Sequence, residues 1–149
     1  MTLETRLSQC RELGEKLREV LAKEHAALVV LDMAAFQFYQ EQKEVTFHIL
    51  GDHFASLRKE LAESGFKSVS DAARAKPQSE LEQLHRKWLS EWEHLVSLMK
   101  KNQALIQAFL RNIAACFNRI AALTSPARTY QRDGRSAKQR PGQMVTVAF

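Results

Sequence analysis

The fold of this chain is decided by residues 78–124, QSELEQLHRKWLSEWEHLVSLMKKNQALIQAFLRNIAACFNRIAALT. Apolar residues recur through this stretch at spacings of three and four, which keeps them on one face of an α-helix. The seam consists of Leu81, Leu84, Trp88, Trp92, Leu95, Met99, Asn102, Ile106, Phe109, Ile113, Cys116, Ile120 and Leu123. The stretch stops at Thr124-Ser125-Pro126, so it predicts one helix roughly 70 Å long at a rise of about 1.5 Å per residue.

A second seam predicts a helix over residues 2–31. Its positions are Leu7, Cys10, Gly14, Leu17, Leu21, Glu24, Leu28 and Leu31. Past Asp32 this register loses its apolar residues, whereas a fresh register from Phe36 regains them. We therefore expect a separate helix over residues 33–64, with Asp32 able to cap it. No Gly or Pro lies at the corner, so one longer, bent helix stays open. Gly65 is expected to end the second helix, because Gly accepts the left-handed conformation that closes helices.

A mixed segment connects the second helix to the third. Ser70 is placed to cap a single turn through Asp71, Ala72 and Ala73. Lys76-Pro77 ends whatever forms there, because the residue before a proline is disfavoured in a helix.

Length and composition set the class of protein. The chain has 149 residues, of which 45% are hydrophobic and 26% charged, with five Gly and three Pro. Together with the seams, this predicts an all-α protein: an antiparallel three-helix coiled-coil-like bundle over residues 1–125, with a long third helix and a flexible basic tail over residues 126–149. The tail has five basic residues and one acidic residue, so most of the net charge of +5 belongs to it. It has too little apolar surface to build a core of its own.

The sequence also gives an expectation for the compartment in which the protein acts. The longest apolar run, Ala26 to Leu31, is too short to span a bilayer, so we expect no membrane insertion. The N-terminus lacks the basic start and apolar centre of a secretory signal, so the expected compartment is the cytoplasm. Cys10 and Cys116 make no disulfide framework, and both fall on seam positions, where a free cysteine packs as a small apolar side chain.

The third helix is expected to be longer than its neighbours. If the three helices run up, down and up, its last apolar positions are left unpaired. These positions are Leu110, Ile113, Cys116, Phe117, Ile120 and Leu123. Such a stripe is typical of a dimer seam or of a docking site for a partner helix. The other interpretation is that helix pairing is offset and that the chain covers the stripe itself.

Side chains with metal-binding or catalytic chemistry lack a workable arrangement. Glu82 with His85, and Glu91 with His94, imitate the Glu-x-x-His motif of di-iron bundles, which needs two such motifs on different helices. Here both lie on one helix. We therefore expect no metal, no cofactor and no enzymatic activity.

Two polar residues interrupt the apolar seams, Lys43 in the second helix and Asn102 in the third. Polar residues at such positions commonly fix the register of helices or their oligomeric state, at some cost in stability.

Four groups of residues follow one another in a familiar order. They are Ala27-Leu28, Asp32, Phe36, Lys43 and Phe47; Gly65-Phe66; Asn102, Leu105 and Ile106; and Tyr130, Gly134 and Arg135. In this order and spacing they resemble the FlgN-type flagellar export chaperones, which are small cytoplasmic helical proteins of type III export.

The resemblance implies a chaperone without catalytic activity. Its clients would be the first and third hook-associated proteins of the hook–filament junction, which it would hold before export and deliver to the cytoplasmic domain of the export gate. Carried over by position, the client-binding candidates are Ile106, Phe109, Ile113, Phe117 and Ile120, and the gate-docking candidate is Tyr130.

Two other function classes stay open. A homodimeric coiled-coil adaptor without a client would use the same stripe of the third helix. A nucleic-acid-binding module would use the basic tail, which has phosphate-neutralising charge but no recognisable reading module, so we expect no nucleic-acid partner.

Overall fold

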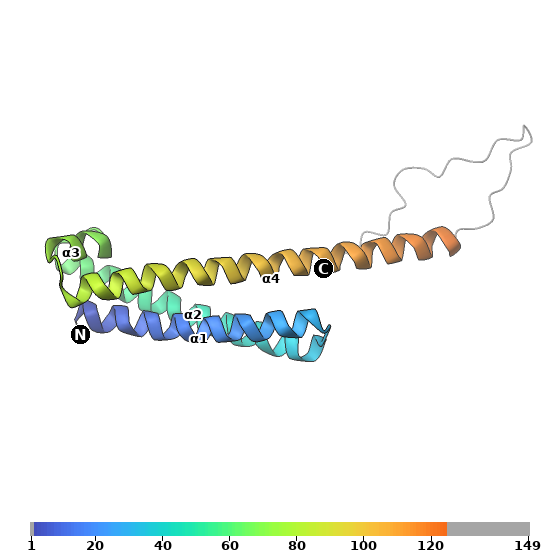
Figure 1. Cartoon of the computed structure of the whole chain (residues 1–149), viewed down its shortest axis with the longest axis horizontal. Coiled ribbons are helices and arrows are strands. Elements are labelled where there is room, and N and C mark those ends of the chain that lie inside the picture. The colour runs from blue at the N-terminus through green and yellow to red at the C-terminus, as the bar shows by residue number, and fades with distance from the viewer. Residues whose placement is uncertain (1, 125–149) are drawn as a thin grey trace, which may run out of the picture. The chain divides into compact units, whose positions relative to one another are not determined.

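The computed structural model describes residues 2–124, and these residues form helices and no strand (Figure 1). In chain order the helices are α1 (Leu3–Val29), α2 (Met33–Glu63), α3 (Val69–Ala75) and α4 (Glu80–Thr124). The prediction of an all-helical chain is confirmed. The expected tail, residues 126–149, lies outside the described residues. None of the described helices combines the length and hydropathy that a bilayer-spanning segment needs.

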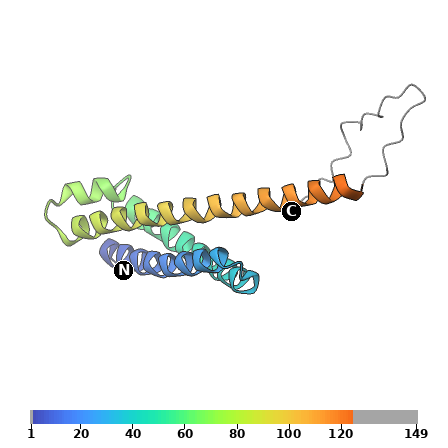
Figure 2. The same cartoon turned by 45° about the vertical axis from the view of Figure 1, so that its right-hand side comes forward.

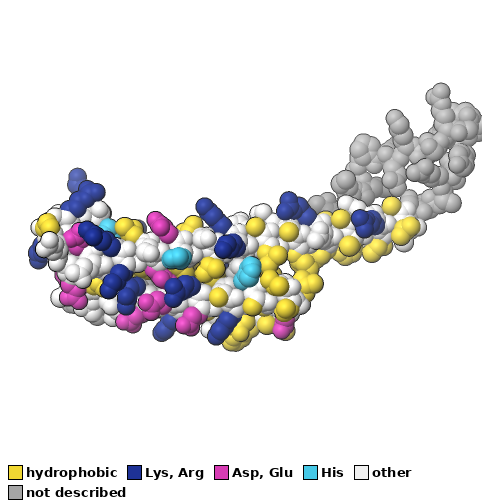
Figure 3. Space-filling model, viewed as in Figure 1, with side chains coloured by type: hydrophobic (Ala, Val, Ile, Leu, Met, Phe, Trp, Pro, Cys, Tyr) yellow, Lys and Arg dark blue, Asp and Glu magenta, His cyan; other side chains and the backbone are white. Residues whose placement is uncertain are grey.

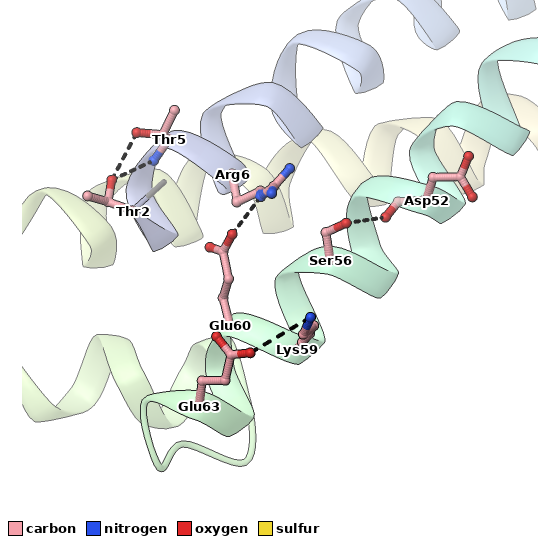
Figure 4. Close-up of polar contacts among 8 residues, drawn as sticks. All are labelled: Thr2, Thr5, Arg6, Asp52, Ser56, Lys59, Glu60 and Glu63. Carbon is pink, nitrogen blue, oxygen red and sulfur yellow. Dashed lines mark hydrogen bonds and ion pairs between the residues drawn. The ribbon is translucent and has the colours of Figure 1, made fainter.

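The described chain divides into two units, with the division between Ala104 and Leu105 inside α4. Within the first unit, α1 and α2 run in opposite directions, because early residues of α1 contact late residues of α2. Arg6 Nε donates to Glu60 Oε1 at 2.7 Å (Figure 4). The first part of α4 lies beside α1 (Figures 1 and 2) and contributes to the same hydrophobic core.

The corner between α1 and α2 is closed by a left-handed residue. Leu31 has a φ of 57°, and the Asp32 N–H donates to the Ala27 carbonyl at 2.9 Å. Asp32 Oδ1 then accepts a hydrogen bond from the Ala35 N–H at 3.1 Å, so the expected cap is confirmed and the two helices are separate. The prediction that Leu31 continues the α1 seam is wrong. Since α1 ends at Val29, the Leu31 side chain is exposed.

The end of α2 is closed in the same way, here with a glycine in the left-handed conformation. Gly65 has a φ of 80°, and the Phe66 N–H donates to the Leu61 carbonyl at 2.9 Å. This confirms the expected role of Gly65. The left-handed conformation costs a residue with a Cβ about 1 kcal/mol or more, so Leu31 stores strain at the first corner that Gly65 avoids at the second.

The mixed segment folds into α3, a helix of seven residues rather than the single turn expected. Its cap is Ser68, whose Oγ accepts from the Asp71 N–H at 3.1 Å. The assignment of the cap to Ser70 is therefore wrong, because the backbone is still extended at Ser68 and already helical by Val69. Ala72 and Ala73 are buried, so α3 closes one end of the core.

Polar contacts fix the start of α4. Ser79 Oγ accepts from the Glu82 N–H at 3.2 Å, and Glu82 Oε2 accepts from the Gln78 N–H at 2.6 Å. This backbone hydrogen bond, together with the bond from the Arg86 guanidinium, holds the pKa of the Glu82 carboxyl below its usual range. The helix begins at Glu80 rather than at Gln78, because Gln78 has a left-handed φ of 60°.

The core follows the predicted seams closely. In α1 the predicted positions from Leu7 to Leu28 are all buried. In α4 the buried residues are Leu81, Trp88, Leu95 and Asn102, and in α2 they are Leu50, Leu57 and Leu61. Aromatic rings fill the centre, where Trp88 lies 5.4 Å from Phe54 and 5.7 Å from Trp92 between ring centroids.

Gly14 brings α4 close to α1. A Cβ added at Gly14 would lie 3.1 Å from Cζ3 of Trp88, which is tighter than ordinary van der Waals contact, and the Trp88 ring is held by its aromatic neighbours. Gly51 in α2 is the natural comparison, because a Cβ added there would meet nothing within 4 Å.

We predict opposite effects for the same substitution at these two glycines. Gly51→Ala should raise the free energy of unfolding by about 1 kcal/mol, the usual gain in helix propensity. Gly14→Ala should lower it by about 1 kcal/mol, because overpacking against Trp88 outweighs that gain. Urea unfolding followed by circular dichroism measures both. Equal stabilisation by the two variants would contradict the close packing of Trp88 on α1.

Candidate functional site

The five client-binding candidates lie on one face of α4, in the second compact unit. Spacings of three and four residues place Ile106, Phe109, Ile113, Phe117 and Ile120 within about 80° of the helix circumference. Phe117 and Ile120 are 50% and 55% exposed, and the other three are half-buried. Figure 3 shows hydrophobic side chains along this half of α4. We call these five residues the apolar stripe.

Further apolar side chains extend the stripe. Leu110 and Leu123 are also exposed, and Leu123 reaches 85%. Exposed apolar residues so close together on one helix favour a protein partner, since monomeric proteins rarely expose contiguous apolar surface without a function for it. The prediction that Cys116 packs as a buried seam residue is wrong, because Cys116 is exposed.

Cys10, the other cysteine, is buried as expected. Burial raises the pKa of its thiol to about 11, an effect that the nearby Arg6 partly opposes. A thiol of this kind stays protonated at neutral pH and is a poor nucleophile.

Charge around the stripe has one sign. From His94 to Thr124, α4 has no acidic residue, and its charged side chains are Lys100, Lys101, Arg111 and Arg119. A partner with carboxylates beside its own apolar face therefore complements this part of α4, whereas a second copy of the same segment brings only more positive charge.

Tyr130, the gate-docking candidate, lies outside the described residues. Its role stays a prediction from the sequence.

A cluster of two buried polar side chains and one half-buried lysine joins α1, α2 and α4 in the first unit. Glu24 of α1 has no exposed surface. Lys43 Nζ of α2 lies 2.8 Å from Glu24 Oε2, and Asn102 Nδ2 of α4 donates to Glu24 Oε1 at 2.9 Å. The same Asn102 amide donates to the Leu21 carbonyl at 2.9 Å. We call Glu24, Lys43 and Asn102 the polar cluster.

His25 completes the bonding of Asn102. His25 Nδ1 lies 2.9 Å from Asn102 Oδ1. Because the Asn102 amide nitrogen already donates twice, its oxygen acts as the acceptor, so His25 must donate from Nδ1.

Sequence reasoning identified Lys43 and Asn102 as polar seam residues but missed the roles of Glu24 and His25. The signal for Glu24 was its place on the α1 seam between Leu21 and Leu28. No comparable signal marked His25.

Side chains of the types that bind metals are spread over the described part of the chain. No group of three or more His, Cys, Asp or Glu side chains among residues 2–124 could hold a metal ion. Two carboxylates of the Glu-x-x-His pairs have other partners. Arg86 donates to Glu82 at 2.7 Å, and Arg18 donates to Glu91 at 3.3 Å.

The chain matches a known protein family. A family described as "FlgN protein" matches residues 1–138, which is most of the chain and includes all four helices. Neither the curated proteins nor the solved structures gave a match.

We predict that the buried ion pair and an exposed one differ in their effects on stability. Lys43→Met should lower the free energy of unfolding by about 3 kcal/mol, because it leaves the buried Glu24 carboxylate without its counter-charge. Lys59→Met removes the partner of Glu63 at the surface, where the two side chains are 80% and 64% exposed, and should cost less than about 1 kcal/mol. Urea unfolding of both variants measures the difference. Equal costs would show that solvent screens Glu24 as well as it screens Glu63.

Proposed function

Because this chain belongs to the FlgN family, a family of flagellar export chaperones, we propose that it binds the first and third hook-associated proteins in the cytoplasm, prevents their premature assembly and delivers them to the type III export gate. The proposal assigns no catalytic step to any residue, in keeping with a chaperone family.

The observation that carries the proposal is the apolar stripe, in which Phe117 and Ile120 are exposed and the other three residues are half-buried. A helix of a client that covers the stripe buries apolar surface, which contributes about 25 cal/mol per Å². Spacings of three and four residues suit an amphipathic helix laid along α4. The absence of acidic residues from His94 to Thr124 favours a client over a second copy of the chain.

The proposal assigns separate tasks to separate parts of the chain. Residues 1–125 would form the client-binding domain, built as an antiparallel three-helix coiled-coil-like bundle. Residues 126–149 would form a flexible basic tail, in which Tyr130 docks on the cytoplasmic domain of the export gate.

We expect charge placed in the stripe to weaken client binding. Ile113→Asp and Phe117→Asp should each weaken binding of the purified first or third hook-associated protein by about 100-fold, since each loses about 2–3 kcal/mol of apolar burial. Isothermal titration calorimetry measures the affinities. Ala115→Asp is the matched control, because Ala115 is exposed on the opposite side of the same helix, and it should bind as the native chain does.

Light scattering on the same samples measures the oligomeric state and so distinguishes the chaperone from a homodimeric adaptor. A dimer that Phe117→Asp dissociates, with no binding of either hook-associated protein, would replace the chaperone proposal with a homodimeric adaptor. Loss of client binding in Ala115→Asp as well would remove the assignment to the stripe.

Tyr130→Ala should separate client binding from delivery. We expect unchanged affinity for the hook-associated proteins, because the substitution lies outside the stripe, together with reduced secretion of those proteins by cells that carry the variant. Calorimetry and immunoblots of culture supernatants measure the two properties. An equal loss of both would contradict the division of tasks between helix and tail.

A further inference from the structure

The apolar seam of α4 does not by itself define one register against α1. Its buried residues, Leu81, Trp88, Leu95 and Asn102, lie seven residues apart. A slide of α4 by seven residues, about 10 Å, therefore places one seam position where another was. The seam continues in the same spacing through Phe109, so apolar residues are available for the shifted arrangement as well.

Asn102 breaks this equivalence. In the observed register it satisfies Glu24 Oε1 and the Leu21 carbonyl. A slide by seven residues in either direction puts Leu95 or Phe109 opposite Glu24, and neither side chain can donate a hydrogen bond. One of those slides also moves Asn102 to the position of Leu95, which has no exposed surface. The shifted arrangements therefore leave the Glu24 carboxylate, and in one case also the Asn102 amide, buried without a hydrogen-bond partner, which is unfavourable.

Gly14 and Trp88 supply a second, steric preference for the same register. The Trp88 ring fits against α1 where there is no Cβ. The contact between Gly14 and Trp88 depends on close packing, whereas the contacts of Asn102 depend on hydrogen bonding. Substitutions can therefore remove one without the other.

We propose that Asn102, acting with Glu24 and Lys43, is a positioning residue that selects the register of α4 and so determines which segment of the seam is left for a partner. A buried ion pair adds little stability over apolar residues of similar size, so its effect lies in excluding other arrangements. A single polar residue in a helical seam is known to act in this way. The consequence for client binding rests on the proposed function; the register itself does not.

Distance measurement between spin labels tests the register. Labels are attached at Glu19→Cys in α1 and Ser97→Cys in α4, both exposed positions of the first unit, in a chain that also has Cys116→Ser. Cys10 stays in place, because its buried thiol does not compete for the label. The native sequence should give one distance. The variant Glu24→Leu/Lys43→Met/Asn102→Leu should give a second population of at least a tenth, with α4 displaced along α1 by about 10 Å.

A single substitution keeps the test valid if the triple variant does not fold. Asn102→Leu alone keeps the ion pair between Glu24 and Lys43 and should also give two distances. Met99→Leu is the matched control, because Met99 packs against the hydrophobic core from the same seam and the substitution leaves Glu24, Lys43 and Asn102 in place, so it should keep the single native distance. One native distance in both apolar variants would overturn the proposal and assign the register to Gly14 and Trp88.

Calorimetry with the purified hook-associated proteins adds the functional outcome. The triple variant should bind at least tenfold more weakly than Met99→Leu, because the shifted molecules leave a different segment of the seam available. If the native chain binds neither client, the proposed function fails, while the distances still decide the register. Equal binding by the triple variant and the control, despite two distances, would overturn the link between register and client.

Discussion

Glu24 has no exposed surface, and the helices of the first unit are arranged so that this carboxylate is not left alone. A charge removed from water loses several kcal/mol of hydration, which only close partners can offset. Lys43 supplies the counter-charge from α2, and Asn102 supplies a hydrogen bond from α4. One side chain of α1 therefore requires a specific residue from each neighbouring helix. The apolar core requires only the right periodicity, so the polar cluster is the more selective constraint on how the helices pair.

The same constraint marks a change along α4. From Leu81 to Asn102, every seventh residue of the seam is buried, whereas from Leu105 onward no described residue is. The sequence pattern does not change there, since Ile106, Phe109 and Ile113 continue the spacing. A helix that keeps an apolar face after its burial ends has surface available for another molecule. The charged side chains of α4 from His94 to Thr124 are all positive, so a partner with carboxylates beside its apolar face complements this part of the helix.

The sequence predicted much of this architecture, because helix periodicity is a local property. The α1 seam from Leu7 to Leu28 was correct, as were the roles of Asp32 and Gly65. The errors concern the exact ends of helices, which depend on the conformation of one or two residues. Leu31 was assigned to the seam because its side chain gives no local sign of a left-handed backbone. The cap of α3 was assigned to Ser70, two residues after the position that Ser68 occupies in the structure. The roles of Lys43 and Asn102 as polar seam residues were visible, but their partners were not, since partner distances depend on tertiary packing. The five stripe residues share one face, as their spacing required, while their binding of a client is a matter for experiment.

Packing in the hairpin of α1 and α2 is uneven, and this explains why a polar cluster is useful where it lies. The fully buried residues of α2 begin at Leu50, so the half from Met33 to Ile49 has none. The corner itself exposes Val29, Val30 and Leu31, and Leu31 adds backbone strain. Apolar burial therefore contributes least at this end, and local opening is easiest where few apolar contacts hold an element. Lys43 lies in that half. Its ion pair with Glu24 gives the loosely packed end a specific attachment to α1, and Asn102 ties α4 to the same point. Directional bonds thus supply the selectivity that close packing supplies around Trp88.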